Sequence, residues 1–327
     1  MQDVKVSVFL TAYNHENYIR KALESIVTQK TNFKFEVLVH DDASTDSTAS
    51  VIKEYAIKYP DLIFPIFQTE YQYSKGVKIV TRFLLPYAKG EYIAYLEGDD
   101  FWCDENKLQL GLHAIEEKKA TACIHRVKIC DSNNKVLGHF PRAEKLIGDQ
   151  VIDSLYAFQL AIDGEIHISS MLIKKTSYQL FAKKFEKFAK DIGFGDIPIF
   201  AYIAANEKLA FIDKDLSVYN SGVENSYMTK LNLSNEQKIA HYQKSIEFFN
   251  AIYNAFPLFN QKKIIKKRLE LEEYLLQVSL FNYKVIFAKE NKELFKTLTF
   301  KHRLKLKIGR VFPSLIEERE KKKQIKG

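Results

Sequence analysis

Residues 1–118 alternate short apolar runs with segments in which apolar positions recur every three or four residues. The apolar runs lie at 6–10, 35–39, 62–67 and 92–96, and helix-like spacing lies at 19–27, 52–59, 77–87 and 108–115. Short apolar runs separated by helices of this length are typical of βαβ units. The pattern therefore predicts an α/β fold with a mostly parallel sheet and helices on both faces.

Turn-forming and capping residues support these boundaries. Pro60 follows the second helical segment, which a proline cannot prolong. Pro65 lies within the third apolar run and would remove a ladder hydrogen bond, so that run suits an edge strand. Asn14 is expected to cap the first helix, and Asp104 the helix near 108–115.

After about residue 128 the alternation of strand-like and helix-like segments becomes less regular. It predicts strands at 166–173 and 209–213, helices at 178–190 and 197–205, and only helices from about residue 234 onward. The sequence therefore predicts an α/β region followed by an all-helical C-terminal extension.

Composition agrees with a folded chain of about two domains. The chain has 327 residues, of which 46% are hydrophobic. It has no apolar stretch near the roughly 18 residues of a membrane span, and its N-terminus does not resemble a secretory leader. The three cysteines form no CxxC pair, so we expect reduced thiols in a cytoplasmic protein and no zinc site.

The net charge of +8 is concentrated at one end of the chain. Residues 296–327 hold eleven Lys and Arg against three Glu, so the preceding part is close to neutral. We therefore expect no nucleic-acid partner bound across the main body. A nucleic-acid site confined to the tail would bind in a salt-sensitive way.

Polar clusters follow three of the predicted strands. In open parallel sheets, ligands bind beyond the carboxyl ends of the strands. The clusters are Thr11-Ala12-Tyr13-Asn14, Asp41 to Asp46, and Glu97-Gly98-Asp99-Asp100. Their coincidence predicts a ligand site at that edge.

The third cluster crowds the carboxylates of Glu97, Asp99 and Asp100 against the end of an apolar run. A helix-cap role would explain Asp104 but not these three acids. Mg²⁺ or Mn²⁺ would relieve their repulsion, and Mg²⁺ usually completes its shell with phosphate oxygens. A metal with a diphosphate therefore explains the cluster better, and Gly98 would permit the sharp turn.

The second cluster has two interpretations. Asp41 and Asp42 could form only a turn, or they could accept hydrogen bonds from a base or ribose while Tyr13 stacks on the base. The eight histidines form no HxH or HxxxH pair, which indicates no metal role for most of them. GxSxG, GxxxxGK[ST] and GxGxxG motifs are also missing from the sequence.

Four segments in this order resemble family 2 glycosyltransferases of the GT-A fold: "VSVFLTAYNHENYIRKALESIVTQ", "FEVLVHDDASTDST", "KGEYIAYLEGDDFWCDENKLQ" and "FGDIPIF". The resemblance is close over about 4–118 and weaker to about 228. It implies a nucleotide-sugar-binding half at 1–128, an acceptor-binding half at 129–230 and a helical extension at 231–327.

The resemblance implies an inverting enzyme that passes a sugar from a nucleoside diphosphate, often UDP, to an acceptor hydroxyl, with Mn²⁺ or Mg²⁺ as cofactor. It assigns Asp196 as general base, although that residue could also be only a helix cap. Asp99 would face ribose or diphosphate, Asp100 the metal, and Glu97 and Gly98 the donor sugar or the surroundings of the metal. The residues implied in nucleotide binding are Thr11, Ala12, Tyr13, Asn14, Asp41, Asp42 and Asp99.

One departure from the family concerns the metal. Relatives often carry an Arg and a His shortly after the tyrosine that matches Tyr219, and neither follows Tyr219 here. Glu224 or Asn225 are the candidates to replace that His. The departure also supports an alternative, a degenerate transferase that binds a nucleotide or glycan without catalysis.

The basic C-terminal tail suggests where in the cell the protein acts. Leu304, Ile308, Val311, Phe312 and Leu315 fall on one helical face among basic residues. Such a helix could lie on an anionic membrane, or dock on the body or on a second subunit. Membrane contact would suit a lipid-linked glycan acceptor in the synthesis of capsule or lipopolysaccharide, at the inner face of the cell membrane. The sequence leaves the oligomeric state open.

Overall fold

The computed structural model describes residues 3–143, 145–185, 196–223 and 235–312. The chain divides into two compact units, Met1–Ser221 and Gly222–Gly327. The expected division of the first unit near residue 128 stays a prediction.

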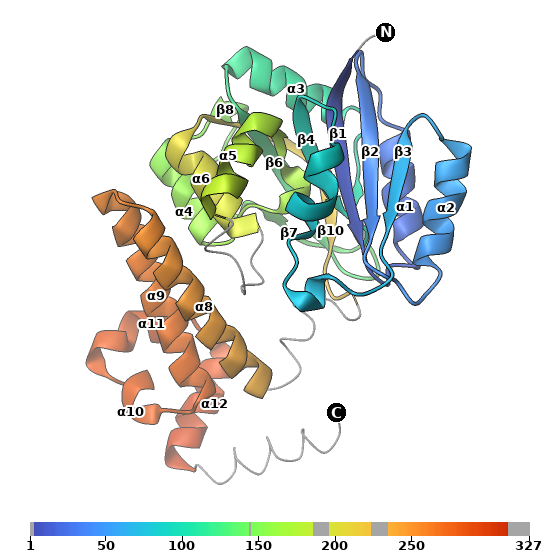
Figure 1. Ribbon diagram of the computed structural model, residues 1–327. Helices are drawn as coiled ribbons and strands as arrows, with labels where there is room; N and C mark the ends of the chain where they lie inside the picture. Colours follow the sequence, from blue (N-terminus) through green and yellow to red (C-terminus); the bar gives the residue numbers. More distant parts are fainter. Residues whose placement is uncertain (1–2, 144, 186–195, 224–234, 313–327) are drawn as a thin grey trace. The chain divides into compact units, whose positions relative to one another are not determined.

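The first unit is built on one sheet with the strand order β3-β2-β1-β4-β9-β6-β10-β5 (Figure 1). Strands β3, β2, β1 and β4 are parallel neighbours, and β10 is parallel to β6, whereas β9 runs antiparallel to both β4 and β6. Short antiparallel strands β5, β7 and β8 complete it. The strands are β1 (Val4–Ala12), β2 (Lys34–Asp41), β3 (Ile63–Phe67), β4 (Tyr92–Glu97), β5 (Phe101–Trp102), β6 (Ala122–Cys130), β7 (Val136–Phe140), β8 (Gln150–Val151), β9 (Leu172–Lys174) and β10 (Leu209–Asn220).

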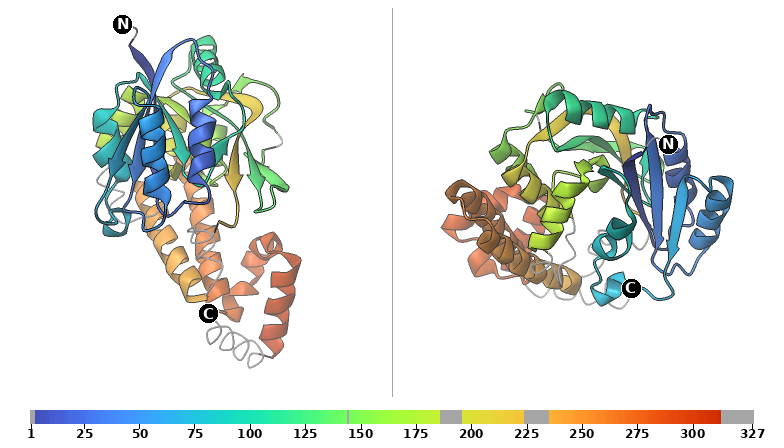
Figure 2. Two further views of the ribbon diagram at one scale, coloured as in Figure 1. Left: turned by 90° about the vertical axis from the view of Figure 1, so that its right-hand side faces the viewer. Right: turned by 45° about the horizontal axis from the view of Figure 1, so that its top comes forward.

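Helices cover both faces of this sheet, as predicted (Figure 2). The apolar stripes of α1 (Ile19–Val27), α2 (Thr48–Lys58) and α3 (Lys107–Lys118) share one core with alternate strand residues such as Val8 and Ala94. On the other face, Phe9 contacts Tyr95, and Tyr95 contacts Tyr178 of α5. The remaining helices of this unit are α4 (Ser154–Ile162), α5 (Lys175–Phe185) and α6 (Asp196–Asn206).

The second unit is built from helices over its described residues, as predicted. Its elements are α8 (Asn235–Ala255), α9 (Phe259–Ser279), α10 (Tyr283–Ile286), α11 (Lys292–Thr297) and α12 (Phe300–Val311). Buried side chains of Tyr274, Ile286, Leu298 and Leu306 form a core between α9, α10 and α12. None of the helices in the described ranges is long and apolar enough to cross a bilayer.

Two predictions made from prolines in the N-terminal third were confirmed. Strand β3 is an edge strand, as Pro65 indicates, and α2 ends just before Pro60. The expected helix at 77–87 is instead a π-helical turn, Val80–Leu84, followed by a 3₁₀ turn, Leu85–Tyr87.

Both expected helix caps were wrong. Helix α1 begins after Tyr18 instead, and Asn14 lies in a left-handed conformation where its Oδ1 accepts from the amide of Thr45. Helix α3 begins after Asn106. Asp104 accepts from the Asn106 amide and pairs with Lys214 at 2.6 Å. Each of these two side chains accepts a hydrogen bond from an amide in a loop rather than from an amide in the first turn of a helix.

The strand expected at 166–173 was wrong over most of its length. Only Leu172–Lys174 pairs in the sheet, and Ile168–Ser170 forms a 3₁₀ turn. The amide and the hydroxyl of Ser169 both lie within hydrogen-bond distance of His167 Nδ1, and Ser170 Oγ donates to the His167 carbonyl oxygen. These local hydrogen bonds compete with strand pairing.

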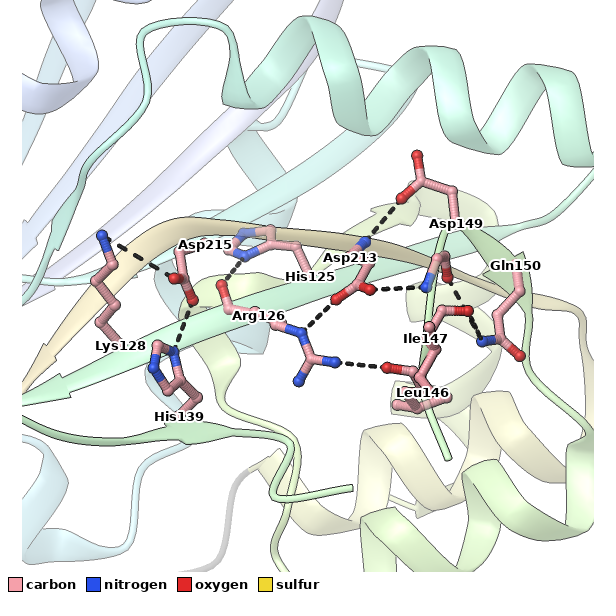
Figure 3. Close-up of polar contacts among 11 residues, drawn as sticks. His125, Arg126, Lys128, His139, Leu146, Ile147, Asp149, Gln150, Asp213 and Asp215 are labelled. Carbon is pink, nitrogen blue, oxygen red and sulfur yellow. Dashed lines mark hydrogen bonds and ion pairs between the residues drawn. The ribbon is translucent and has the colours of Figure 1, made fainter. Parts of the chain in front are cut away.

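A polar network joins β6 to β10 where the pairing of β10 is irregular, near residues 212–217 (Figure 3). The Arg126 guanidinium donates to the Asp213 carboxylate and to the Leu146 carbonyl oxygen. Asp213 also accepts from the Gly148 amide at 2.7 Å, and its own amide donates to Asp149. We call these contacts the Arg126–Asp213 network. It fixes β10 just before the residues that reach the candidate site.

We expect Arg126→Ala to lower the free energy of unfolding by about 1.5–3 kcal/mol, because it leaves the half-buried Asp213 carboxylate without its charged donor. Hydrogen bonding to Arg126 lowers the pKa of Asp213 below its unfolded value. The stabilisation is therefore present above that unfolded value and is lost as pH falls. Urea unfolding at pH 7 and at pH 3, which is below the unfolded pKa of about 3.9, measures both effects.

Lys128→Ala is the matched control, since its ammonium lies 4.0 Å from Asp215 in a more exposed pair. Such pairs contribute about 0–1 kcal/mol. Equal losses in the two variants would contradict the special role of the Arg126–Asp213 network.

Candidate active site

The three polar clusters of the sequence meet at the carboxyl ends of β2, β1 and β4. Thr11 lies opposite His40 on one side and Glu97 on the other, and Ala12 lies opposite Asp41. The Gly98 amide donates to the Thr11 carbonyl oxygen at 2.8 Å. The Asp42 amide donates to the Ala12 carbonyl oxygen at 2.9 Å. The sheet thus brings the clusters to one edge, as its parallel order requires.

Gly98 is needed for close packing rather than for an unusual backbone angle. A Cβ at this position would lie 2.8 Å from His15 Nδ1 and 3.1 Å from the Thr11 carbonyl oxygen. The turn after β4 therefore passes directly against the loop after β1. This close approach brings His15 Nε2 to 3.9 Å from Asp99 Oδ2.

The loop after β1 is tied to the loop after β2. The Asn14 amide donates to Ser44 Oγ, and Ser44 in turn donates to the buried Asp41 carboxylate. Burial raises the pKa of Asp41, while its hydrogen bonds with Ser44 lower it. These contacts give Asn14 and Asp41 structural roles in addition to the nucleotide-binding roles expected of them.

An aromatic pair lies beside these loops. The ring of Tyr13 stacks on Tyr71 with centroids 4.0 Å apart and ring planes 5° apart. The buried Asp42 carboxylate accepts from the amides of Gln72 and Tyr73, both at 2.9 Å. Sequence reasoning missed Tyr71, although the aromatic pair in Tyr71-Gln72-Tyr73 was a visible signal. A base could reach Tyr13 from this side only by displacing Tyr71.

The acidic cluster at the end of β4 is held by the end of β10. Asp100 is 1% exposed, and its Oδ1 accepts from the Asn220 amide at 3.0 Å. The Asn220 side-chain amide donates to the Asp99 carbonyl oxygen. Asp100 Oδ2 is buried and has no hydrogen-bond partner among the described residues. A buried carboxylate oxygen without a partner is costly unless a cation or a proton satisfies it.

Burial raises the pKa of Asp100 well above its usual range, and repulsion from Asp99 and Glu97 adds to the shift. Loss of hydration within the cluster and repulsion from Asp99 and Asp196 raise the pKa of Glu97 to about 8. Since the Glu97 side chain still reaches solvent, we attribute more of its shift to the repulsion. Both shifts report excess negative charge that a cation would neutralise.

A histidine from a distant part of the chain completes this cluster. His167 Nε2 lies 3.7 Å from Asp100 Oδ2. Ligand atoms of Glu97, Asp100 and His167 all lie within 4.8 Å of one another. The imidazole lies beside the rings of Tyr219 and Phe140, with centroid distances of 4.8 and 5.8 Å. Sequence reasoning found no histidine pair and so missed His167.

Asp196 begins α6, and its Oδ1 accepts from the Ile197 amide at 2.9 Å. Its charge raises the pKa values of Glu97 and Tyr73, so the carboxylate lies within electrostatic reach of the acidic cluster. Burial raises the pKa of Asp196 itself. The preceding residues 193–195, and the proposed ligands Glu224 and Asn225, lie outside the described residues.

These residues fit a divalent cation. Carboxylate oxygens and an imidazole nitrogen are suitable donors, and the unpartnered Asp100 oxygen faces the same space as His167. Asp99, Asp100 and Glu97 also supply the negative charge that binding would neutralise. The arrangement is suited to a metal-bound diphosphate at the end of β4, with the carboxylate of Asp196 nearby.

Several known proteins resemble parts of this chain. Residues 7–167 match the family model described as glycosyl transferase family 2. The uncharacterized protein Rv1520 of Mycobacterium tuberculosis is 39% identical over 137 residues, which is 42% of this chain and 39% of that protein. WfgD of Escherichia coli, a UDP-Glc:alpha-D-GlcNAc-diphosphoundecaprenol beta-1,3-glucosyltransferase, is 29% identical over 46% of this chain and 56% of its own length. The chain thus spans about two fifths to just over half of these relatives.

Solved structures show the same fold. TarS of S. aureus, residues 1–349 with UDP-GlcNAc, has a TM-score of 0.58 and 19% identity, covering 93% of this chain and 79% of that one. The mannosyltransferase PcManGT of Pyrobaculum calidifontis, with GDP-Man and Mn²⁺, has a TM-score of 0.55 and 18% identity, covering 99% and 87%. The fold is that of GT-A glycosyltransferases, and residues 7–167 resemble glycosyl transferase family 2.

Proposed function

Because residues 7–167 match glycosyl transferase family 2, we propose that the protein transfers a sugar from a nucleoside diphosphate to an acceptor hydroxyl, with inversion at the anomeric carbon. Residues 1–128 would bind the donor, and residues 129–230 the acceptor. The observation that carries the proposal is the cluster of Glu97, Asp99 and Asp100 at the end of β4, where the charge of Asp196 also acts on Glu97.

UDP is the nucleotide that we propose. WfgD uses UDP-Glc by its name, and TarS was solved with UDP-GlcNAc. The base would enter between the loops that carry Tyr13 and Asp42, and would displace Tyr71 to stack on Tyr13. Asp99 would accept from the ribose or face the diphosphate, and Glu97 would lie beside the donor sugar.

In the transfer step, the acceptor hydroxyl oxygen forms a bond to the anomeric carbon while the bond from that carbon to the diphosphate oxygen breaks. The diphosphate leaves with the bonding electron pair. The carboxylate of Asp196 accepts the hydroxyl proton, for which its raised pKa makes it a better base. Asp100 would hold a divalent cation, which would stabilise the negative charge of the leaving diphosphate.

A thermal-shift screen of nucleotide sugars with and without Mn²⁺ tests the proposal. We expect stabilisation by a UDP-sugar that depends on Mn²⁺, together with slow release of UDP as the sugar is hydrolysed. Binding without any release of UDP, even with acceptor extracts, would favour the non-catalytic scaffold instead.

We also propose that the acceptor is a lipid-linked glycan in cell-surface glycan synthesis, reached at the inner face of the membrane through α12. WfgD acts on such an acceptor by its name. The side chains of Phe300, Leu304, Ile308 and Val311 recur along one face of α12 and are all exposed, whereas Leu306 and Gly309 are buried. Lys301, Arg303 and Lys307 flank this face, a pattern that suits an anionic membrane surface.

We expect the double variant Leu304→Asp/Ile308→Asp to lose binding to phosphatidylglycerol-containing vesicles by at least about tenfold, because it places two charges in the apolar face. Both side chains are already exposed, so folding should be preserved. Vesicle co-sedimentation measures the effect.

Leu258→Asp is the control, since it changes an exposed leucine outside α12. Unchanged vesicle binding of the double variant would refute the membrane role. If the double variant instead converts a dimer to a monomer, α12 contacts a second copy.

A further inference from the structure

His167 has no role in the sequence motifs, yet it is the nearest imidazole to the unpartnered oxygen of Asp100. The 3.7 Å between His167 Nε2 and Asp100 Oδ2 is too long for a hydrogen bond. Two ligand atoms, each about 2.1 Å from one cation and at right angles, lie about 3 Å apart. A small closing movement would therefore let both atoms bind one ion.

The hydrogen bonds behind His167 favour the tautomer that ligation requires. Ser169 Oγ donates to Ser217 Oγ at 3.3 Å, so its lone pair is free to accept from His167 Nδ1 at 2.8 Å. A proton on Nδ1 leaves the lone pair of Nε2 directed at the Asp100 side. The opposite tautomer would use the longer contact of 3.3 Å from the Ser169 amide. Metal-bound histidines typically donate their second nitrogen in this way.

Packing restricts the imidazole further. Its side chain is 12% exposed, and the rings of Phe140 and Tyr219 lie beside it. The 3₁₀ turn Ile168–Ser170 directly follows His167, and Ser169 and Ser170 are buried. Described residues of the first unit therefore hold the ring against the acidic cluster.

We propose that His167 is a protein ligand, with Asp100, of the divalent cation at the end of β4. This inference rests on the proposed function and assigns to His167 the part that a histidine after Tyr219 would play. Glu97 lies close enough to bind the same ion directly or through water. An imidazole ligand disfavours Mg²⁺, which takes oxygen ligands, so the site should prefer a transition ion such as Mn²⁺ over Mg²⁺.

Mn²⁺ binding to the full chain, with and without UDP, tests this inference. Electron paramagnetic resonance measures the concentration of free Mn²⁺. Pulsed measurements detect the modulation of the Mn²⁺ spin echo by a bound imidazole nitrogen. We expect nitrogen modulation in the wild type. We expect His167→Gln to lose it and to weaken Mn²⁺ binding by at least about tenfold. We expect His167→Asp to bind Mn²⁺ more tightly than His167→Gln but with less preference over Mg²⁺.

His113→Gln is the control, since it removes an exposed imidazole on α3. Mn²⁺ binding without nitrogen modulation, or modulation that survives in His167→Gln, would overturn the inference and leave the proposed function intact. Binding of UDP by a wild type that binds no Mn²⁺ would instead contradict the metal dependence in the proposed function. If a His167 variant fails to fold, the absence of nitrogen modulation in the wild type would still overturn the inference.

Discussion

Replacing Asp196 by Asn is expected to lower the rate of sugar transfer by about 10²–10⁴-fold, because it removes the carboxylate that accepts the proton of the acceptor hydroxyl. The isosteric amide keeps an oxygen for the Ile197 amide, so the start of α6 should be preserved. Binding of UDP and Mn²⁺ should be unchanged, since Asp196 is not one of the residues placed around the metal. Single-turnover transfer and calorimetric UDP titration measure the two properties separately.

Asp163→Asn is the matched control, because it removes a carboxylate at the end of α4. A variant at Asp196 that turns over normally would show that another residue is the base. Loss of UDP binding in the same variant would show that Asp196 supports the donor site rather than the chemistry.

The raised pKa of Asp196 gives this prediction a pH dependence. Only the ionised carboxylate can accept the proton, so kcat falls as pH falls through the pKa of Asp196. Burial raises that pKa, so the acid limb should lie above the ordinary Asp value of about 3.9. The profile is measured at saturating donor and Mn²⁺. Unchanged kcat down to about pH 4 would contradict the role of Asp196.

Local patterns predicted the N-terminal part of the fold because its elements are encoded in short windows. The buried face of α1 consists of Ile19, Ala22, Leu23 and Ile26, which are the residues that helical spacing selects. Strand β6 escaped prediction because His125, Arg126 and Lys128 interrupt its apolar pattern. The long-range pairs of Arg126 with Asp213 and of Lys128 with Asp215 allow these polar residues within the sheet.

The candidate site likewise contains residues that the sequence predicted and residues that it missed. Glu97, Asp99 and Asp100 are adjacent in sequence, so their crowding was visible from the start. His167 and Asn220 reach Asp100 only through the pairing of β4, β9, β6 and β10, and single-sequence patterns do not encode that order. Tyr71, in the loop after β3, likewise stacks on Tyr13, in the loop after β1. Residues that depend on long-range topology were therefore the ones missed.

Replacing Asp100 by Asn should have opposite effects on the metal-free and metal-bound protein. In the metal-free protein, Asp100 is buried among like charges and its Oδ2 has no partner among the described residues, so a neutral isostere should stabilise the fold. Because the pKa of Asp100 is raised in the folded protein, this carboxyl group lowers the free energy of unfolding as pH rises above its pKa in the unfolded protein. The gain in Tm should therefore be larger at pH 8 than at pH 5, at about 2–4 °C for each kcal/mol.

With Mn²⁺ and UDP present, the order of stabilities should reverse. The wild type gains stability from binding, by about 2.7 kcal/mol at a ligand concentration of 100 times Kd, whereas Asp100→Asn should gain almost none. Asp104→Asn is the matched control, since its carboxylate pairs with Lys214 outside the cluster. It should retain the Mn²⁺-dependent shift. An Asp100→Asn variant with the full Mn²⁺-dependent shift would refute the metal role of Asp100. A metal-free variant less stable than the wild type would mean that Asp100 contributes to the fold beyond its charge.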